Sequence, residues 1–342
     1  MFKHKNWPMV SLYSATHFFV DFACAFFMFG LIAGMPEGYI CVLLYNFCAF
    51  AMQMPIGLVA DKVNRNYLFA IAGCALVCIA YGLVFSPIFA VIVIGIGNAM
   101  FHIGGGVDVL NISEKKLGAL GVFVSPGAFG IYYGAMLGRG SGFPAILAPS
   151  VLVIAAGLIL VLHKKRGAYP QNAEFSLPHG SARLFIVPVA CLFLVVCLRS
   201  YVGLALDFSW KGIGYLGTAL TCAVVFGKTI GGFAADLWGL KRTMLFSLVS
   251  AALLFMLSGA PIAGVTAILL FNMTMPITLW AMARALQGAK GFAFGLLSFG
   301  LFLGFVPVHL DIRPPHGAPW PFALAAAISL ALLLAGLRKA KT

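Results

Sequence analysis

Charged residues are scarce in this chain, and acidic residues are the scarcest. Asp, Glu, Lys and Arg make up only 9% of the 342 residues, and just nine residues are Asp or Glu. A soluble domain has about 25% charged residues. Hydrophobic residues reach 62%, and the mean hydropathy is +1.03. These values exclude a water-soluble enzyme and predict an all-α polytopic membrane protein.

The chain also lacks the motifs of common enzymatic and metal sites. It contains no HExxH and no GxSxG, and its eight cysteines lie in apolar runs without zinc-like spacing. Gly227-Lys228-Thr229 is not a phosphate loop, because Cys222 stands where that loop requires its first glycine. We therefore expect no enzyme activity, no cofactor, no metal and no disulfide.

Apolar runs long enough to cross a membrane recur twelve times. Transmembrane helices are expected at 7–30, 38–60, 67–85, 88–106, 117–138, 144–163, 183–205, 212–235, 242–259, 262–283, 289–308 and 320–337. The first run carries His17 and Asp21, so we expect a retained span rather than a cleaved signal peptide. A polar stretch at 164–182 is expected to be a cytoplasmic linker between two six-helix bundles, at 1–163 and 183–342.

The basic residues of the loops are distributed unevenly. Most of the 22 lysines and arginines fall on one side of the predicted membrane, whereas loops on the other side hold only Arg139, Lys211 and Arg313. By the positive-inside rule, this pattern places both termini in the cytoplasm of a protein of the cell (plasma or inner) membrane. The net charge of +13 therefore reflects the basic residues of the cytoplasmic loops, and we expect no nucleic acid partner.

Two cytoplasmic loops share one pattern. Gly57 and Asp61 after the second span have the same spacing as Gly232 and Asp236 after the eighth, and Asn64 and Gly239 fit left-handed turn positions. Such a repeat predicts a transporter of two similar bundles. The residues expected to latch the cytoplasmic side are Gly57, Asp61, Arg65, Gly232, Asp236, Lys241 and Arg242.

These loops resemble the signature loop of the major facilitator superfamily, G-x-x-x-D-[RK]-x-G-[RK]-[RK]. The segments HFFVD at 17–21 and GIGNAMFH at 95–102 are similar to the H-x-x-x-D and G-x-G-x-x-x-F-H segments of its fosmidomycin-resistance-like branch. The resemblance implies twelve transmembrane helices in two bundles and proton-driven export. Within it, Asn98 and His102 are candidates for contact with the substrate.

Ionisable side chains inside a membrane are costly and usually face a cavity or a partner. His17 and Asp21 share one face of the first span near mid-membrane, as a proton-coupling pair or as a structural hydrogen bond. His102 is expected to end the fourth helix beside Gly104, Gly105 and Gly106, which should loosen that helix. It is a second candidate for proton coupling, or a cap on helix carbonyls. Asp108 is expected in the following loop.

Two cations also fall inside predicted spans. Arg199 in the seventh span stays charged and needs an anion, which could be Asp21, Asp207, or a carboxylate or phosphate of a substrate. A permanent ion pair and snorkelling to the outer surface are the alternatives. Lys228 in the eighth span could bind substrate, or it could snorkel to the inner surface.

The sequence thus predicts a secondary active transporter. It would export a small organic compound, which could be anionic, in exchange for protons by alternating access. Proton-coupled uptake is the alternative within this class. A non-transporting membrane sensor or assembly subunit, or an intramembrane metal or haem protein, would belong to another class. The expected partners are the substrate, protons and membrane lipid, and the expected oligomeric state is a monomer.

Overall fold

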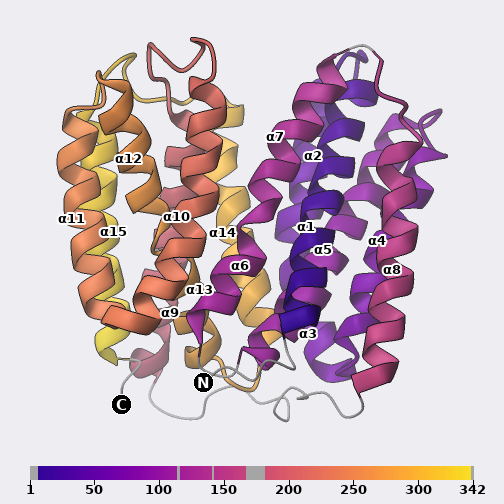
Figure 1. Ribbon diagram of the computed structural model, residues 1–342, viewed down its shortest axis with the longest axis horizontal. Helices are drawn as coiled ribbons and strands as arrows, with labels where there is room; N and C mark the ends of the chain where they lie inside the picture. Colours follow the sequence, from indigo (N-terminus) through magenta and orange to yellow (C-terminus); the bar gives the residue numbers. More distant parts are fainter. Residues whose placement is uncertain (1–6, 114–115, 141, 167–181, 340–342) are drawn as a thin grey trace. The chain divides into compact units, whose positions relative to one another are not determined.

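A computed structural model describes residues 7–113, 116–140, 142–166 and 182–339 (Figure 1). Within these ranges the regular elements are all helices. Most of the predicted linker at 164–182 lies outside the described residues. Its ends belong to helices, because one helix continues to Arg166 and the next begins at Ala182.

The helices follow one another with short connections. In chain order they are α1 (Trp7–Phe27), η2 (Met28–Ile32), α2 (Gly38–Asn46), η3 (Phe47–Ala51), α3 (Gln53–Val63), α4 (Asn66–Tyr81), α5 (Pro87–Ile112), α6 (Leu117–Val124), α7 (Pro126–Arg139), α8 (Leu147–Arg166), α9 (Ala182–Ala205), α10 (Leu216–Trp238), α11 (Leu240–Met256), α12 (Pro261–Asn272), α13 (Met275–Ala285), α14 (Lys290–His309) and α15 (Trp320–Lys339). The π-helical segments η2 and η3 directly continue α1 and α2.

Ten helical stretches in the described residues are long and apolar enough to cross a membrane. Some combine two elements, such as Leu117–Arg139 from α6 and α7. The apolar α4 is shorter, and α11 has 17 residues. The ten long stretches overlap ten of the twelve predicted spans, and α4 and α11 overlap the other two without being long enough to count among these stretches. Asn64 takes the left-handed turn conformation expected of it, with φ of 53° and ψ of 38°. Gly239 also has a positive φ, of 85°, but its ψ of 155° lies outside that turn conformation, in a region that only glycine adopts readily.

The end of the fourth predicted span is wrong. The α5 helix continues through Gly104 and Gly106 to Ile112, because these glycines allow close packing instead of loosening the helix. A side chain on Gly104 would overlap the backbone of α4 at Ala70. Asp108 therefore lies in the α5 helix and not in a loop. Its side chain is buried and accepts a 2.7 Å hydrogen bond from the Tyr13 hydroxyl.

The chain divides into two compact units. Unit 1 comprises Met1–Glu114, Pro126–Phe175 and Gly288–Phe299, and unit 2 comprises Lys115–Ser125, Ser176–Gln287 and Gly300–Thr342. These units differ from the predicted halves at two segments. The short helix α6 packs within unit 2, and the first part of α14 packs within unit 1.

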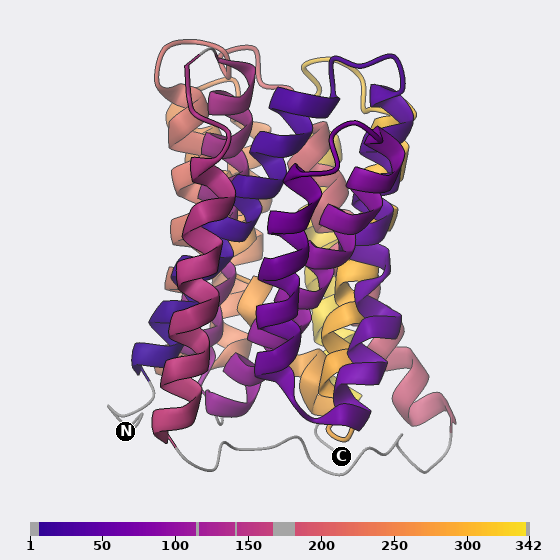
Figure 2. The ribbon, with the colours of Figure 1, turned by 90° about the vertical axis from the view of Figure 1, so that its right-hand side faces the viewer.

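Each unit is a set of closely packed helices. In unit 1, α1 packs on α5, α7 and α8, and α4 packs between α5 and α8 (Figure 2). Gly130 and Gly134 of α7 lie against the α1 backbone at Phe18 and Phe22, so the two helices approach closely. In unit 2, α9 packs on α13 and α15, while α10 packs on α6 and α12.

Candidate proton and substrate sites

Three titratable side chains meet in the interior of unit 1. The His17 and His102 Nε2 atoms lie 2.9 Å apart, and they lie 3.2 and 3.6 Å from the two carboxylate oxygens of Asp21. All three residues are less than 10% exposed. We call these three residues the His-Asp-His cluster. The expectation that His102 ends a helix is wrong, because α5 continues ten residues beyond it, to Ile112.

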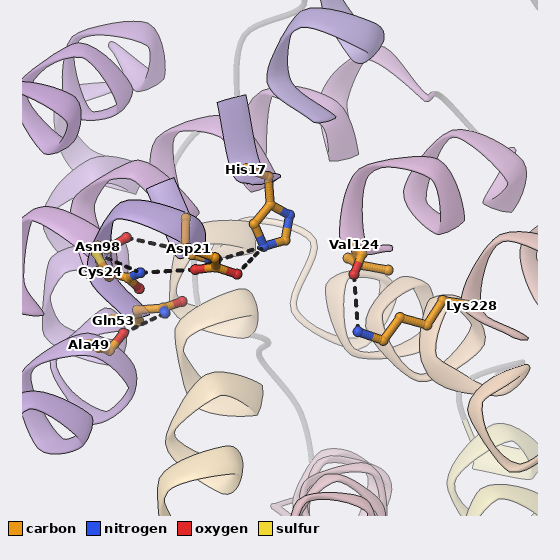
Figure 3. Close-up of polar contacts among 9 residues, drawn as sticks. His17, Asp21, Cys24, Ala49, Gln53, Asn98, Val124 and Lys228 are labelled. Carbon is orange, nitrogen blue, oxygen red and sulfur yellow. Dashed lines mark hydrogen bonds and ion pairs between the residues drawn. The ribbon is translucent and has the colours of Figure 1, made fainter. Parts of the chain in front are cut away.

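Asn98 orients this cluster. Its side-chain amide donates to Asp21 Oδ1 at 3.0 Å (Figure 3). Its backbone carbonyl lies 2.9 Å from His102 Nδ1. A carbonyl can only accept, so His102 carries its hydrogen on Nδ1 when neutral. The neutral His102 then offers a lone pair on Nε2, and the hydrogen between the two rings belongs to His17. About one turn after Asp21 in α1, the Cys24 thiol also contacts the Asn98 amide.

The start of α7 closes the cluster on one side. A side chain on Gly127 would overlap both His17 Nε2 and Asp21 Oδ2, so only glycine fits there with these rotamers. Sequence reasoning did not connect Gly127 with the cluster. The only signal was the Ser125-Pro126-Gly127 turn, which does not reveal which helix faces it.

A second buried polar group lies in unit 2. The Arg199 guanidinium donates through Nη2 to the Thr274 and Thr278 hydroxyls at 2.9 and 3.2 Å, and through Nη1 to Met275 Sδ at 3.2 Å. Its side chain is buried, and Nε has no hydrogen-bond partner. Arg199 therefore does not snorkel to a surface, and the described residues of unit 2 supply no carboxylate to it.

The two buried sites occupy corresponding places in the internal repeat. The offset that superposes Gly57 on Gly232 also places Arg199 at the position of Cys24, one turn from Asp21. It likewise places Thr274 next to the position of Asn98. Corresponding helix pairs thus carry an acidic group in unit 1 and a basic group in unit 2.

Lys228 is half-buried. Its ammonium group donates to the Val124 carbonyl at 3.2 Å, at the C-terminal end of α6 (Figure 3). A cation at this position interacts favourably with the helix carbonyls. The neighbouring Thr229 hydroxyl donates to the Ser125 hydroxyl at 2.7 Å. The lysine therefore belongs to the packing of α6 on α10, and a substrate-binding role for it stays a prediction.

The two loop aspartates each cap the start of another helix. Asp61 accepts from the Gly291 and Phe292 N–H groups of α14 at 2.7 and 2.8 Å. Asp236 accepts from the Leu117 and Gly118 N–H groups of α6, both at 2.9 Å. A carboxylate at a helix N-terminus satisfies free N–H groups and complements the helix dipole.

The glycines of the same motifs make these contacts possible. Side chains on Gly57 and Gly232 would overlap the backbone at Gly291 and Leu117, respectively. The basic residues of the predicted latch take no part in these contacts. Arg65, Lys241 and Arg242 are exposed, and in the described part of the chain none forms an ion pair with either aspartate.

Lys241 and Arg242 instead line a surface pocket of about 470 Å³. Trp238 and Leu334 also line this pocket, which lies where α10 meets α11 beside α15. At the start of α14, sequence reasoning overlooked Lys290, which donates to the Asn111 side chain at 2.7 Å.

Comparison with known proteins identifies the fold. No protein-family model and no curated protein matches the sequence. A variant of the fucose:proton symporter of E. coli aligns with a TM-score of 0.65 and 14% identity, over 96% of this chain and 98% of that one. The major facilitator superfamily transporter FucP in the outward conformation aligns with a TM-score of 0.67 and 14% identity, over 98% and 99%. The chain has the fold of these transporters and is a multi-pass membrane protein.

Proposed function

We propose that the chain is a secondary active transporter that moves a small organic compound across the cell membrane, driven by protons. The transporter fold supports this assignment at the level of architecture. The observation that carries the proton coupling is the burial of Asp21 between two imidazole rings. Asp21, His17 and His102 are the coupling residues of this proposal, and Asn98 positions them.

The cluster is suited to hold one exchangeable proton. A proton on either ring is stabilised by the Asp21 carboxylate, whereas a second proton would place two cationic rings 2.9 Å apart. Such closely spaced groups titrate as one unit. Because proton occupancy changes the charge of this buried cluster, it can bias the equilibrium between conformations with different access to water.

The two capped helix starts provide a conformational latch in this proposal. Asp61 holds the start of α14 within unit 1, and Asp236 holds the start of α6 within unit 2. Any movement of either helix start away from its aspartate loses two charge-assisted hydrogen bonds. The caps therefore favour one state of the alternating-access cycle. Gly57 and Gly232 permit the contact, while Arg65, Lys241 and Arg242 contribute positive charge on the cytoplasmic side.

Export in exchange for protons is the direction implied by the sequence resemblance to the fosmidomycin-resistance-like branch. Uptake with protons is the second candidate, and it is favoured by the similarity in fold to a fucose:proton symporter. We further propose a monomer with cytoplasmic termini and twelve transmembrane helices in two bundles. Substrate, protons and lipid are its partners.

Reconstitution tests the proposal. Untargeted metabolite comparison of deletion and overexpressing cells first identifies compounds whose levels depend on the protein, and these are then loaded into proteoliposomes. We expect their flux to follow an imposed pH gradient and to stop when the gradient is collapsed. A sensor or assembly subunit would show no flux. The sign of the pH gradient that drives accumulation distinguishes export from uptake.

A further inference from the structure

The positive charge of Arg199 has no counter-charge among the described residues of its unit. Unit 2 contains only three acidic residues, Asp207, Asp236 and Asp311. Asp207 pairs with His316 at 2.6 Å, and Asp311 pairs with Arg313 at 3.0 Å; all four of these side chains are exposed. Asp236 caps α6. None of the three carboxylates is available to neutralise the buried guanidinium.

The groups that do contact Arg199 are neutral and are held in place by the backbone. The Thr278 hydroxyl donates to the Thr274 carbonyl at 2.8 Å, and the Thr274 hydroxyl donates to the Phe271 carbonyl at 3.2 Å. Both hydroxyl oxygens are therefore left as acceptors for the guanidinium. The two hydroxyls fix the plane of the guanidinium without neutralising its charge. The buried N–H group on Arg199 Nε has no hydrogen-bond partner.

A buried, uncompensated charge is unfavourable for folding, so its retention calls for a function. We infer that Arg199, held by Thr274 and Thr278, is an oxyanion site and that the transported compound carries a carboxylate or phosphate group. This assignment of substrate class rests on the proposed transport function. The planar guanidinium suits both groups, because its N–H donors match pairs of oxygen atoms.

The first test needs no ligand. In the purified full-length protein, Arg199→Met removes the charge and leaves both threonine hydroxyls bonded to the backbone. The matched control is Arg284→Met. Arg284 is an exposed arginine of the adjoining α13, and its guanidinium lies over the Trp280 ring. We expect Arg199→Met to melt at the same temperature as the wild type or higher. Melting clearly below both the wild type and Arg284→Met would show a structural guanidinium and overturn the inference.

The second test uses defined anions in nanodiscs at constant ionic strength. The probes are benzoate against its neutral analogue benzamide, and phenyl phosphate against phenol. We expect at least one anion to raise the melting temperature more than its neutral analogue. In Arg199→Met its apparent affinity should fall about ten- to hundred-fold, while Arg284→Met should bind like the wild type.

The outcomes separate the anion site from proton coupling. One outcome is that the anion still raises the melting temperature of Asp21→Asn when this variant shows no proton-driven flux. That result supports the anion site even if the coupling proposal fails. The absence of an anion-dependent shift in the wild type, or an equal shift in Arg199→Met, overturns the oxyanion assignment and leaves coupling at Asp21 to be judged by its own flux measurement. A stronger response to phenyl phosphate than to benzoate would identify a phosphate rather than a carboxylate.

Discussion

His17 and His102 lie with their Nε2 atoms 2.9 Å apart, although they come from different helices. The neutral His102 carries its hydrogen on Nδ1, toward the Asn98 carbonyl, and can accept the His17 hydrogen on Nε2. A proton arriving at His102 Nε2 would meet that hydrogen, so His17 must then turn or change tautomer. Proton binding thus changes the hydrogen bonding of α1 to α5.

The paired imidazoles predict a change in pH dependence. Replacing His102 with glutamine removes one of the groups that titrate together beside Asp21. We expect the pH at which flux is half-maximal to shift, because one of the two rings that share the exchangeable proton is lost. Flux is measured across a pH series in proteoliposomes. His316→Gln, which alters an exposed histidine, is the control and should retain the wild-type profile. The same half-maximal pH in all three proteins would exclude His102 from proton coupling.

Gly127 predicts a steric effect on the same cluster. Gly127→Ala introduces a Cβ where His17 and Asp21 lie, so we expect loss of flux and destabilisation of about 1–3 kcal/mol. Gly157→Ala in α8 is the control, because the corresponding Cβ would enter open space. Melting temperature and flux are measured for both. Normal flux in Gly127→Ala would mean that α7 does not close over the cluster during transport.

The capping aspartates predict a conformational effect with little loss of folding. In Asp61→Asn and Asp236→Asn, one amide oxygen replaces two carboxylate oxygens, so each variant loses the charge and one backbone hydrogen bond. We expect a cost of about 1–2 kcal/mol to the capped state and a reduced transport rate at normal expression. Asp311→Asn, at an exposed loop carboxylate, is the control. Wild-type flux in both capping variants would mean that the two caps stabilise the fold and do not act in the transport cycle.

The uneven distribution of basic residues predicts the topology. Single cysteines placed at 164–182 and at 314–319, in a background without other reactive cysteines, should react with an impermeant maleimide from opposite sides of the membrane. Labelling in intact cells is compared with labelling in inverted vesicles. Reaction from the same side would contradict the twelve-helix arrangement with cytoplasmic termini.

Periodicity and charge in the sequence were enough to predict the helices and the His17–Asp21 pair, because a span needs a long apolar run and a four-residue spacing defines a helix face. They could not predict that His102 joins this pair. That contact depends on the rotation of α5 against α1, which is set by packing between residues distant in sequence. The glycines after His102 were misread for the same reason, because their role is seen only from the helix they pack against.

The loop aspartates show a similar limit. The repeat predicted that Asp61 and Asp236 act equivalently, and in the structure both cap a helix start. Their partners at Gly291 and Leu117 have no charge or motif that a sequence pattern could detect, because the donors are backbone N–H groups. The sequence instead drew attention to Arg65 and Arg242, whose side chains are exposed.

The most direct test of the account is the response of Asp21→Asn to an imposed pH gradient. The amide is nearly isosteric and cannot ionise, so counterflow exchange of the substrate should continue while accumulation against its gradient is lost. Asp207→Asn, at an exposed carboxylate, should accumulate substrate like the wild type. Accumulation is measured in proteoliposomes after a pH step. Accumulation by Asp21→Asn at the wild-type level would contradict the claim that the His-Asp-His cluster couples protons to transport.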